Sequence, residues 1–190
     1  NSKIKKLTDL ISKRHIKELL LPTLEVVNLY NYIQLIDKEI SNLLSNKKIT
    51  TKEGDSSFIK EVLGKLFKTL SGNTVQISWS HGDFQMANIL TREKKFKVID
   101  WESANKRFYL YDLYILEGGI RSGVSLKESI EIFREKISFS KIIIMNEDTI
   151  SLLLIEELRF CINEEYSENF YAPGFKIKQI CESILNYLNE

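Results

Sequence analysis

The chain has 190 residues, which is long enough for one substantial hydrophobic core. Its 43% hydrophobic and 28% charged residues are ordinary for a globular protein, and its formal net charge of +1 gives no general attraction to nucleic acid. No apolar run reaches the roughly 18 to 20 residues of a membrane span and no secretory signal opens the chain, so we expect a cytoplasmic protein with no membrane span and no nucleic-acid partner.

Most of the chain before residue 80 has the pattern of helices. A basic segment runs from Lys3 to Lys17, and apolar residues then recur at helical spacing over 24–44 and again over 58–70. The polar stretch 46–57 between the last two predicts a loop. This part of the chain contains only isolated glycines and no glycine-rich loop that could cover the phosphates of a nucleotide.

A strand pattern follows. Val75, Ile77 and Trp79 alternate with polar residues, as in a half-buried strand, and this strand leads into His81. Trp101, further along the chain, is expected to pack in the core.

A second extended region predicts a β-hairpin. Residues 88–90 and 96–99 have strand patterns and are separated by a polar turn over 92–95. Pairing of these strands would bring Asn88, at the start of the first, beside Asp100, just after the second.

The polar residues at these positions suit phosphoryl transfer. That reaction needs a carboxylate to orient the acceptor hydroxyl and oxygen ligands to hold the magnesium that neutralises the phosphates. Asp83 offers the carboxylate, whereas Asn88 and Asp100 offer the oxygen ligands.

Helices are predicted again after the hairpin. The first covers 112–117 and ends near Gly118-Gly119, and the second begins at a capping box that starts with Ser125 and extends to about residue 137. Two more cover 148–163 and 176–189. The acidic and aromatic loop between them, 164–174, offers rings and carboxylates that suit a cationic ammonium group, but it also fits a loop with its rings folded onto the core.

The segment 80–116 resembles the aminoglycoside phosphotransferase and choline kinase superfamily. Members share a His-x-Asp, four residues, Asn loop, here 81–88, followed by Ile-Asp-Trp/Phe-Glu, here 99–102. Residues 99–105 and 111–113, together with Gln85, are most similar to the choline and ethanolamine kinase branch.

The resemblance implies a role for each matched residue. Asp83 would be the catalytic base, and Asn88 and Asp100 would bind the Mg²⁺ that accompanies ATP. Glu102 and Gln85 would contact a second metal or the substrate. His81 and Asp112 would be scaffold residues of the loop.

The implied fold class is α+β and mainly α: the C-terminal lobe of a protein kinase-like fold, helical with a small β-hairpin that carries the site. We expect residues 1–190 to form a single domain, the catalytic and substrate lobe, with the N-terminal nucleotide lobe absent from this chain and acting as its partner. The isolated chain would then be inactive.

The leading hypothesis is an ATP-dependent phosphotransferase that phosphorylates a hydroxyl of a small molecule, either a choline-like amino alcohol or a sugar. An aminoglycoside-type antibiotic kinase is an alternative within the same superfamily. An alternative from another class is a catalytically inactive pseudokinase or regulatory binding module.

Overall fold

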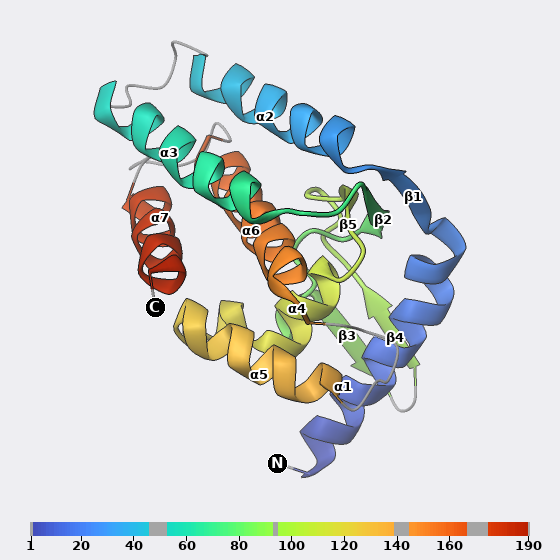
Figure 1. The fold of residues 1–190 in the computed structure, drawn as a ribbon. Helices are drawn as coiled ribbons and strands as arrows, with labels where there is room; N and C mark the ends of the chain where they lie inside the picture. Colours follow the sequence, from blue (N-terminus) through green and yellow to red (C-terminus); the bar gives the residue numbers. More distant parts are fainter. Residues whose placement is uncertain (1, 46–52, 93–94, 139–144, 167–174, 190) are drawn as a thin grey trace. The chain divides into compact units, whose positions relative to one another are not determined.

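A computed structural model describes residues 2–45, 53–92, 95–138, 145–166 and 175–189. The described chain is mainly helical, with small antiparallel sheets, which confirms the coarse fold class (Figure 1). Its α-helices are α1 (Ser2–His15), α2 (Leu29–Ser45), α3 (Glu53–Thr69), α4 (Tyr111–Gly118), α5 (Leu126–Ser138), α6 (Glu147–Tyr166) and α7 (Phe175–Leu188). Its strands are β1 (Glu25–Asn28), β2 (Thr74–Ser80), β3 (Ile89–Arg92), β4 (Lys95–Val98) and β5 (Asn105–Phe108).

The chain divides into two compact units. Unit 1 comprises 1–26 and 76–144, and unit 2 comprises 27–75 and 145–190. Every residue predicted for the site lies in unit 1. The prediction that 1–190 is a single C-terminal lobe stays a prediction.

The described part of unit 2 is built mainly from helices α2, α3, α6 and α7. Within it α3, α6 and α7 pack on one another, and α2 packs on α6 (Figure 1). Each helix buries an apolar stripe, because its apolar residues recur every three or four positions. Fully buried members of these stripes include Ile36, Ile40, Leu63, Leu66, Leu154, Leu158 and Ile184.

Unit 1 contains the predicted hairpin, which the structure confirms. Strands β3 and β4 pair antiparallel, with Ile89 opposite Val98 and Arg92 opposite Lys95, so the strands extend one residue into each end of the predicted turn. Strand β2 pairs antiparallel with β5 in a sheet of order β1-β2-β5.

Helices α4 and α5 pack closely within unit 1. Gly118 allows this approach, because a Cβ there would lie 2.9 Å from Ser129 Oγ. Gly119, at φ 70°, ends α4 where the sequence predicts, and the Glu128 N–H donates to Ser125 Oγ at 3.2 Å at the start of α5.

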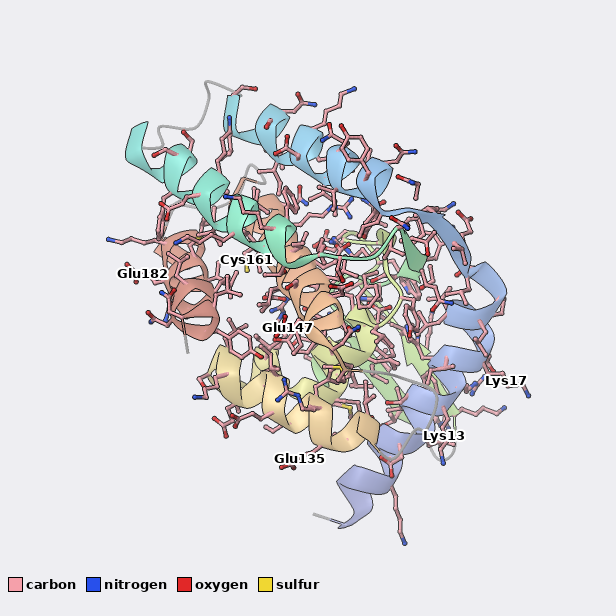
Figure 2. The ribbon with its side chains drawn as sticks, viewed as in Figure 1. Lys13, Lys17, Glu135, Glu147, Cys161 and Glu182 are labelled. Carbon is pink, nitrogen blue, oxygen red and sulfur yellow. The ribbon has the colours of Figure 1, made fainter. Side chains whose placement is uncertain are left out.

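Helix α1 continues into a wider π-helical turn, Ile16–Leu20, and then a short 3₁₀ turn, Leu21–Thr23. Lys13 and Lys17 point outward from this segment (Figure 2), and both are exposed. The opposite side of α1 is buried: there Ile11 belongs to a buried cluster with Phe84, Ile89 and Leu116, and Thr8, Ser12 and His15 are buried as well. This cluster joins α1 to the loop between β2 and β3.

Four expectations were wrong. Residues 53–57, which were expected in a loop, form the start of α3. Residues 25–28 form β1 rather than the start of a helix, because Val26 and Val27 are β-branched and the Asn28 side chain caps α2, accepting from the Asn31 N–H at 3.0 Å. Near the end of β2 the alternation of buried and exposed residues is the reverse of the expected one: Ser78 is buried, whereas Trp79 is 46% exposed. Trp101 is also exposed, at 44%.

Candidate active site

The loop from Ser80 to Asn88 connects β2 to β3 through a sharp turn at Gly82. Gly82 has φ 86°, and a Cβ added there would lie 2.4 Å from the carbonyl oxygen of Ser103. Only glycine satisfies both conditions without strain. The loop then closes with a 3₁₀ turn over Met86–Asn88.

Asp112, near the start of α4, holds the backbone of this loop. Its Oδ2 accepts from the His81 N–H at 2.8 Å, and its Oδ1 accepts from the Gly82 N–H at 3.1 Å and from the Ser80 hydroxyl at 2.6 Å. The ring of His15, the last residue of α1, lies 2.7 Å from Oδ2 through its Nε2. Asp112 therefore ties the loop, α4 and α1 together at one buried carboxylate.

The charge of Asp112 is stabilised by these partners. Its complete burial would by itself raise the pKa of the carboxyl. The hydrogen bond and charge of His15, and then the hydrogen bonds from Ser80 and His81, outweigh this effect and lower the pKa below its ordinary value. The carboxylate is therefore the form that the folded loop requires.

His81 connects the loop to the end of β4. Its Nδ1 accepts from the Asp83 N–H at 3.3 Å, and its Nε2 lies 2.8 Å from the carbonyl oxygen of Ile99. Since Nδ1 accepts, the ring proton belongs on Nε2, where it donates to Ile99. The ring of Trp101 covers His81, with centroids 4.8 Å apart. His81 is thus fully buried and has both nitrogens occupied by backbone groups.

The carboxylate of Asp83 accepts three side-chain hydrogen bonds. Arg121 Nε donates to Oδ1 at 3.1 Å, while Gln85 Nε2 and Asn88 Nδ2 donate to Oδ2 at 2.7 and 3.0 Å. Asn88 Nδ2 also donates to the Asp83 carbonyl at 2.9 Å. The structure therefore brings three predicted site residues together around one half-buried carboxylate.

The hairpin places Asn88 next to the segment that carries Asp100. The Ile99 N–H donates to the Asn88 carbonyl at 3.0 Å, so Asp100 is one residue from a direct backbone contact with Asn88. Asp100 has φ 66°, the only positive value among the described non-glycine residues. Such a conformation is uncommon, although Asp and Asn tolerate it best, and it is often retained at functional sites.

Asp100 and Glu102 are both exposed. Among the described residues, neither carboxylate has a hydrogen bond or an ion pair to the protein. The amide of Asn88, by contrast, turns its nitrogen toward Asp83, which leaves its oxygen to face away from that carboxylate.

This donor set suits a hard cation that is shared with phosphates. Within the described ranges, no three His, Cys, Asp or Glu side chains are grouped closely enough to hold a metal by themselves. Magnesium rarely uses such a cage: one or two carboxylates, waters and substrate phosphates are its usual ligands. The Asn88 oxygen and the Asp100 carboxylate fit that pattern, and Glu102 is a further anionic oxygen two residues along.

Two residues of the site were not predicted from the sequence. Arg121 contacts Asp83 across 38 positions and His15 contacts Asp112 across 97, so no local pattern could reveal either pair. The one available signal was the pair of glycines, Gly119 and Gly123, that flank the Arg121 turn.

Residues 167–174 of the predicted acidic and aromatic loop lie outside the described residues. No described helix is long and apolar enough to cross a membrane. Comparisons of the chain with protein-family models, with curated proteins and with solved structures find no match. The resemblance of segment 80–116 to the aminoglycoside phosphotransferase and choline kinase superfamily therefore stays a prediction.

Proposed function

We propose that this chain is the catalytic lobe of an ATP-dependent phosphotransferase that transfers a phosphoryl group to a hydroxyl of a small molecule. One observation carries the proposal. The half-buried carboxylate of Asp83 accepts a hydrogen bond from the side chain of Asn88. The backbone carbonyl of Asn88 in turn accepts from the N–H of Ile99, the residue before Asp100. A candidate base and two candidate metal ligands thus share one short network.

The proposed chemistry uses each of these groups. Asp83 orients the acceptor hydroxyl for in-line attack and accepts its proton as the bond to the γ-phosphorus of ATP forms, while the bond from that phosphorus to the bridging oxygen breaks and ADP leaves. Asn88 and Asp100 would hold the Mg²⁺ of the nucleotide, which supplies neutralisation of charge on the phosphates. Asp112 and His81 hold the loop backbone, so that the position of Asp83 is set before substrate binds.

The acceptor class follows from the resemblance, with a choline-like amino alcohol or a sugar as the first candidates and an aminoglycoside as the alternative. An inactive binding module would have no need for Asp83, Asn88 and Asp100 together. The positive φ of Asp100 favours the enzyme, because this conformation next to a fixed loop costs free energy that a purely structural strand end would avoid.

The test is a transfer assay on the full-length gene product that contains these residues. It is incubated with ATP, Mg²⁺ and, in separate reactions, choline, ethanolamine, a hexose and an aminoglycoside, and phosphorylated acceptor is detected by mass spectrometry. We expect one class of acceptor to be phosphorylated. We expect Asp83→Asn to lower kcat by about a hundredfold or more with ATP affinity nearly unchanged.

Asp37→Asn is the matched control, because Asp37 is a half-buried carboxylate on α2, and it should keep wild-type kinetics. Retention of more than about a tenth of the rate in Asp83→Asn would remove its catalytic role. Binding of ATP without transfer to any acceptor would favour the binding module.

A further inference from the structure

The hydrogen bonds of Asp83 leave only part of its carboxylate open to a substrate. The two oxygens of a carboxylate offer about four acceptor sites. Gln85 and Asn88 occupy both sites of Oδ2, whereas Arg121 Nε occupies one site of Oδ1. An acceptor hydroxyl must therefore approach Oδ1, the oxygen that Arg121 holds.

Arg121 is itself held at a defined place. It lies in a 3₁₀ turn, Ile120–Ser122, between two glycines with positive φ, Gly119 at 70° and Gly123 at 86°. The turn is closed by a hydrogen bond of 2.8 Å from the Ser122 N–H to the Gly119 carbonyl. Both glycines stand where L residues would be strained, so the turn has a restricted course after α4.

The guanidinium of Arg121 also reaches back to the start of α4. Its Nη2 donates to the hydroxyl of Tyr111 at 3.4 Å, and Tyr111 is fully buried beside Asp112. The side chain of Arg121 is only 17% exposed, and that of Asp83 is 21% exposed. One helix thus fixes the loop backbone through Asp112 at its start and the Asp83 side chain through the turn after its end.

We propose that Arg121 is a positioning residue that sets the orientation of the Asp83 carboxylate and so the place of the oxygen that receives the acceptor hydroxyl. This inference rests on the proposed function. The torsion that turns a carboxylate about its own axis has a broad, shallow profile, so the donors to Oδ2 leave the place of Oδ1 weakly defined, and the Arg121 donor to Oδ1 fixes it. Arginine suits this task because it stays protonated across the physiological pH range.

The kinetic test compares Arg121→Ala and Arg121→Lys in the full-length gene product, with the acceptor found by the transfer assay. We expect Arg121→Ala to lower kcat by about 10- to 100-fold, the scale of a misplaced reacting group, with KM for ATP changed less than about twofold. Lysine restores a cation that can reach Oδ1, so Arg121→Lys should recover a large part of the loss. A wild-type kcat in Arg121→Ala would overturn the proposal.

Lys65→Ala is the matched control, since it removes the cation of an exposed ion pair with Glu61 in unit 2 and should leave kcat unchanged. A loss of kcat in Arg121→Ala that Arg121→Lys did not relieve, accompanied by a matching fall in Tm, would assign Arg121 a merely structural role and overturn the proposal.

Crystal structures of the wild type and both variants separate this proposal from the proposed function. We expect the Asp83 carboxylate to keep its orientation in the wild type and in Arg121→Lys, and to be rotated or disordered in Arg121→Ala. Failure of the wild type to phosphorylate any acceptor would end the proposed function, and these structures would still decide whether Arg121 orients Asp83. An unchanged carboxylate in Arg121→Ala would overturn the positioning role.

Discussion

Asp83 and Asp100 are the same residue type in opposite environments. The carboxylate of Asp83 is half-buried and accepts from three side chains. The carboxylate of Asp100 is exposed and, among the described residues, has no protein partner. A group that must orient a hydroxyl needs to be fixed, whereas a metal ligand must be open to the ion, so the two environments match the two proposed roles.

Substitution of Asp100 by Asn tests the metal role cleanly, because Asn also tolerates a positive φ and adds little backbone strain. We expect Asp100→Asn in the full-length protein to lose most activity and to require more Mg²⁺, since a hard cation loses an anionic oxygen ligand. The measurement is kcat and KM as a function of Mg²⁺ concentration. Asp9→Asn, an exposed change on α1, should behave like the wild type.

Wild-type kinetics and an unchanged Mg²⁺ dependence in Asp100→Asn would remove Asp100 from the metal site. Glu102→Gln in the same assay would then show whether the neighbouring carboxylate carries that role.

The two cysteines differ in reactivity for a physical reason. Neither forms a disulfide, but Cys161 on α6 is half-buried whereas Cys181 on α7 is fully buried. Burial, and then the charge of Glu182, raise the pKa of the Cys181 thiol to about 12. Figure 2 shows Cys161 and Glu182 on these two helices.

Because the thiolate is the reactive form, we expect iodoacetamide at neutral pH to label Cys161 well before Cys181. Peptide mass spectrometry over a time course measures both rates. In denaturant the two rates should become similar. Equal rates in the folded protein would contradict the burial of Cys181.

At the scale of elements, α1 is joined to the loop by a polar and an apolar contact. His15 bonds to Asp112, and its ring stacks on Phe84 with centroids 3.9 Å apart and planes 19° from parallel. The buried cluster of Ile11, Phe84, Ile89 and Leu116 lies on the same side of α1. The first helix of the chain therefore supports a loop that begins more than sixty residues later.

The lowered pKa of Asp112 predicts a loss of stability in acid. Its folded pKa lies below the unfolded value of about 4, so its contribution is fully present above about pH 4 and is lost as pH falls through the folded pKa. We expect Tm to fall over this range. Asp112→Asn should have a lower Tm at pH 7 and a smaller further loss in acid, as measured by thermal unfolding between pH 7 and about pH 2.

Asp9→Asn serves as the control, because Asp9 is exposed and its substitution should leave the fall of Tm in acid unchanged. If Tm fell as much in acid for Asp112→Asn as for the wild type, other carboxylates would be the cause of the acid loss of stability.

At the scale of the whole molecule, each unit contains a buried charged group with its partners. In unit 1 this group is Asp112. In unit 2 it is Arg159, whose Nη2 lies 2.7 Å from a Glu39 oxygen and whose Nη1 lies 3.4 Å from Glu156, a carboxylate that also accepts from the Tyr32 hydroxyl. Arg159 and Glu156 are almost completely buried.

Removal of the arginine would leave buried carboxylate charge without its cation. We expect Arg159→Ala to lower the free energy of unfolding by about 3–5 kcal/mol. That loss corresponds to a fall in Tm of roughly 6–20 °C for a chain of this size. Arg14→Ala, which breaks an exposed pair with Glu18, should change Tm little. A Tm for Arg159→Ala within about 2 °C of the wild type would contradict the prediction.

The sequence determined the local elements of this protein. Helical spacing and a capping box predicted α2 to α7, with the starts of α2 and α3 five residues off, and the polar turn between two apolar runs predicted the hairpin of β3 and β4. These patterns depend on neighbours in the chain. The same local spacing predicted that Asn88 and Asp100 would meet. Local spacing failed at 25–28, where two valines and the cap at Asn28 favour a strand.

Only the tertiary structure decided which distant groups surround the site. The contact of Arg121 with Asp83 and that of His15 with Asp112 depend on how α1 and the turn after α4 pack against the loop, and a polar contact between such distant positions leaves no periodic trace in the sequence. The positive φ of Asp100 and the exposure of Trp79 and Trp101 likewise depend on which faces other elements cover. Residue spacing thus fixed the candidate chemistry, while long-range packing fixed the partners that hold it in place.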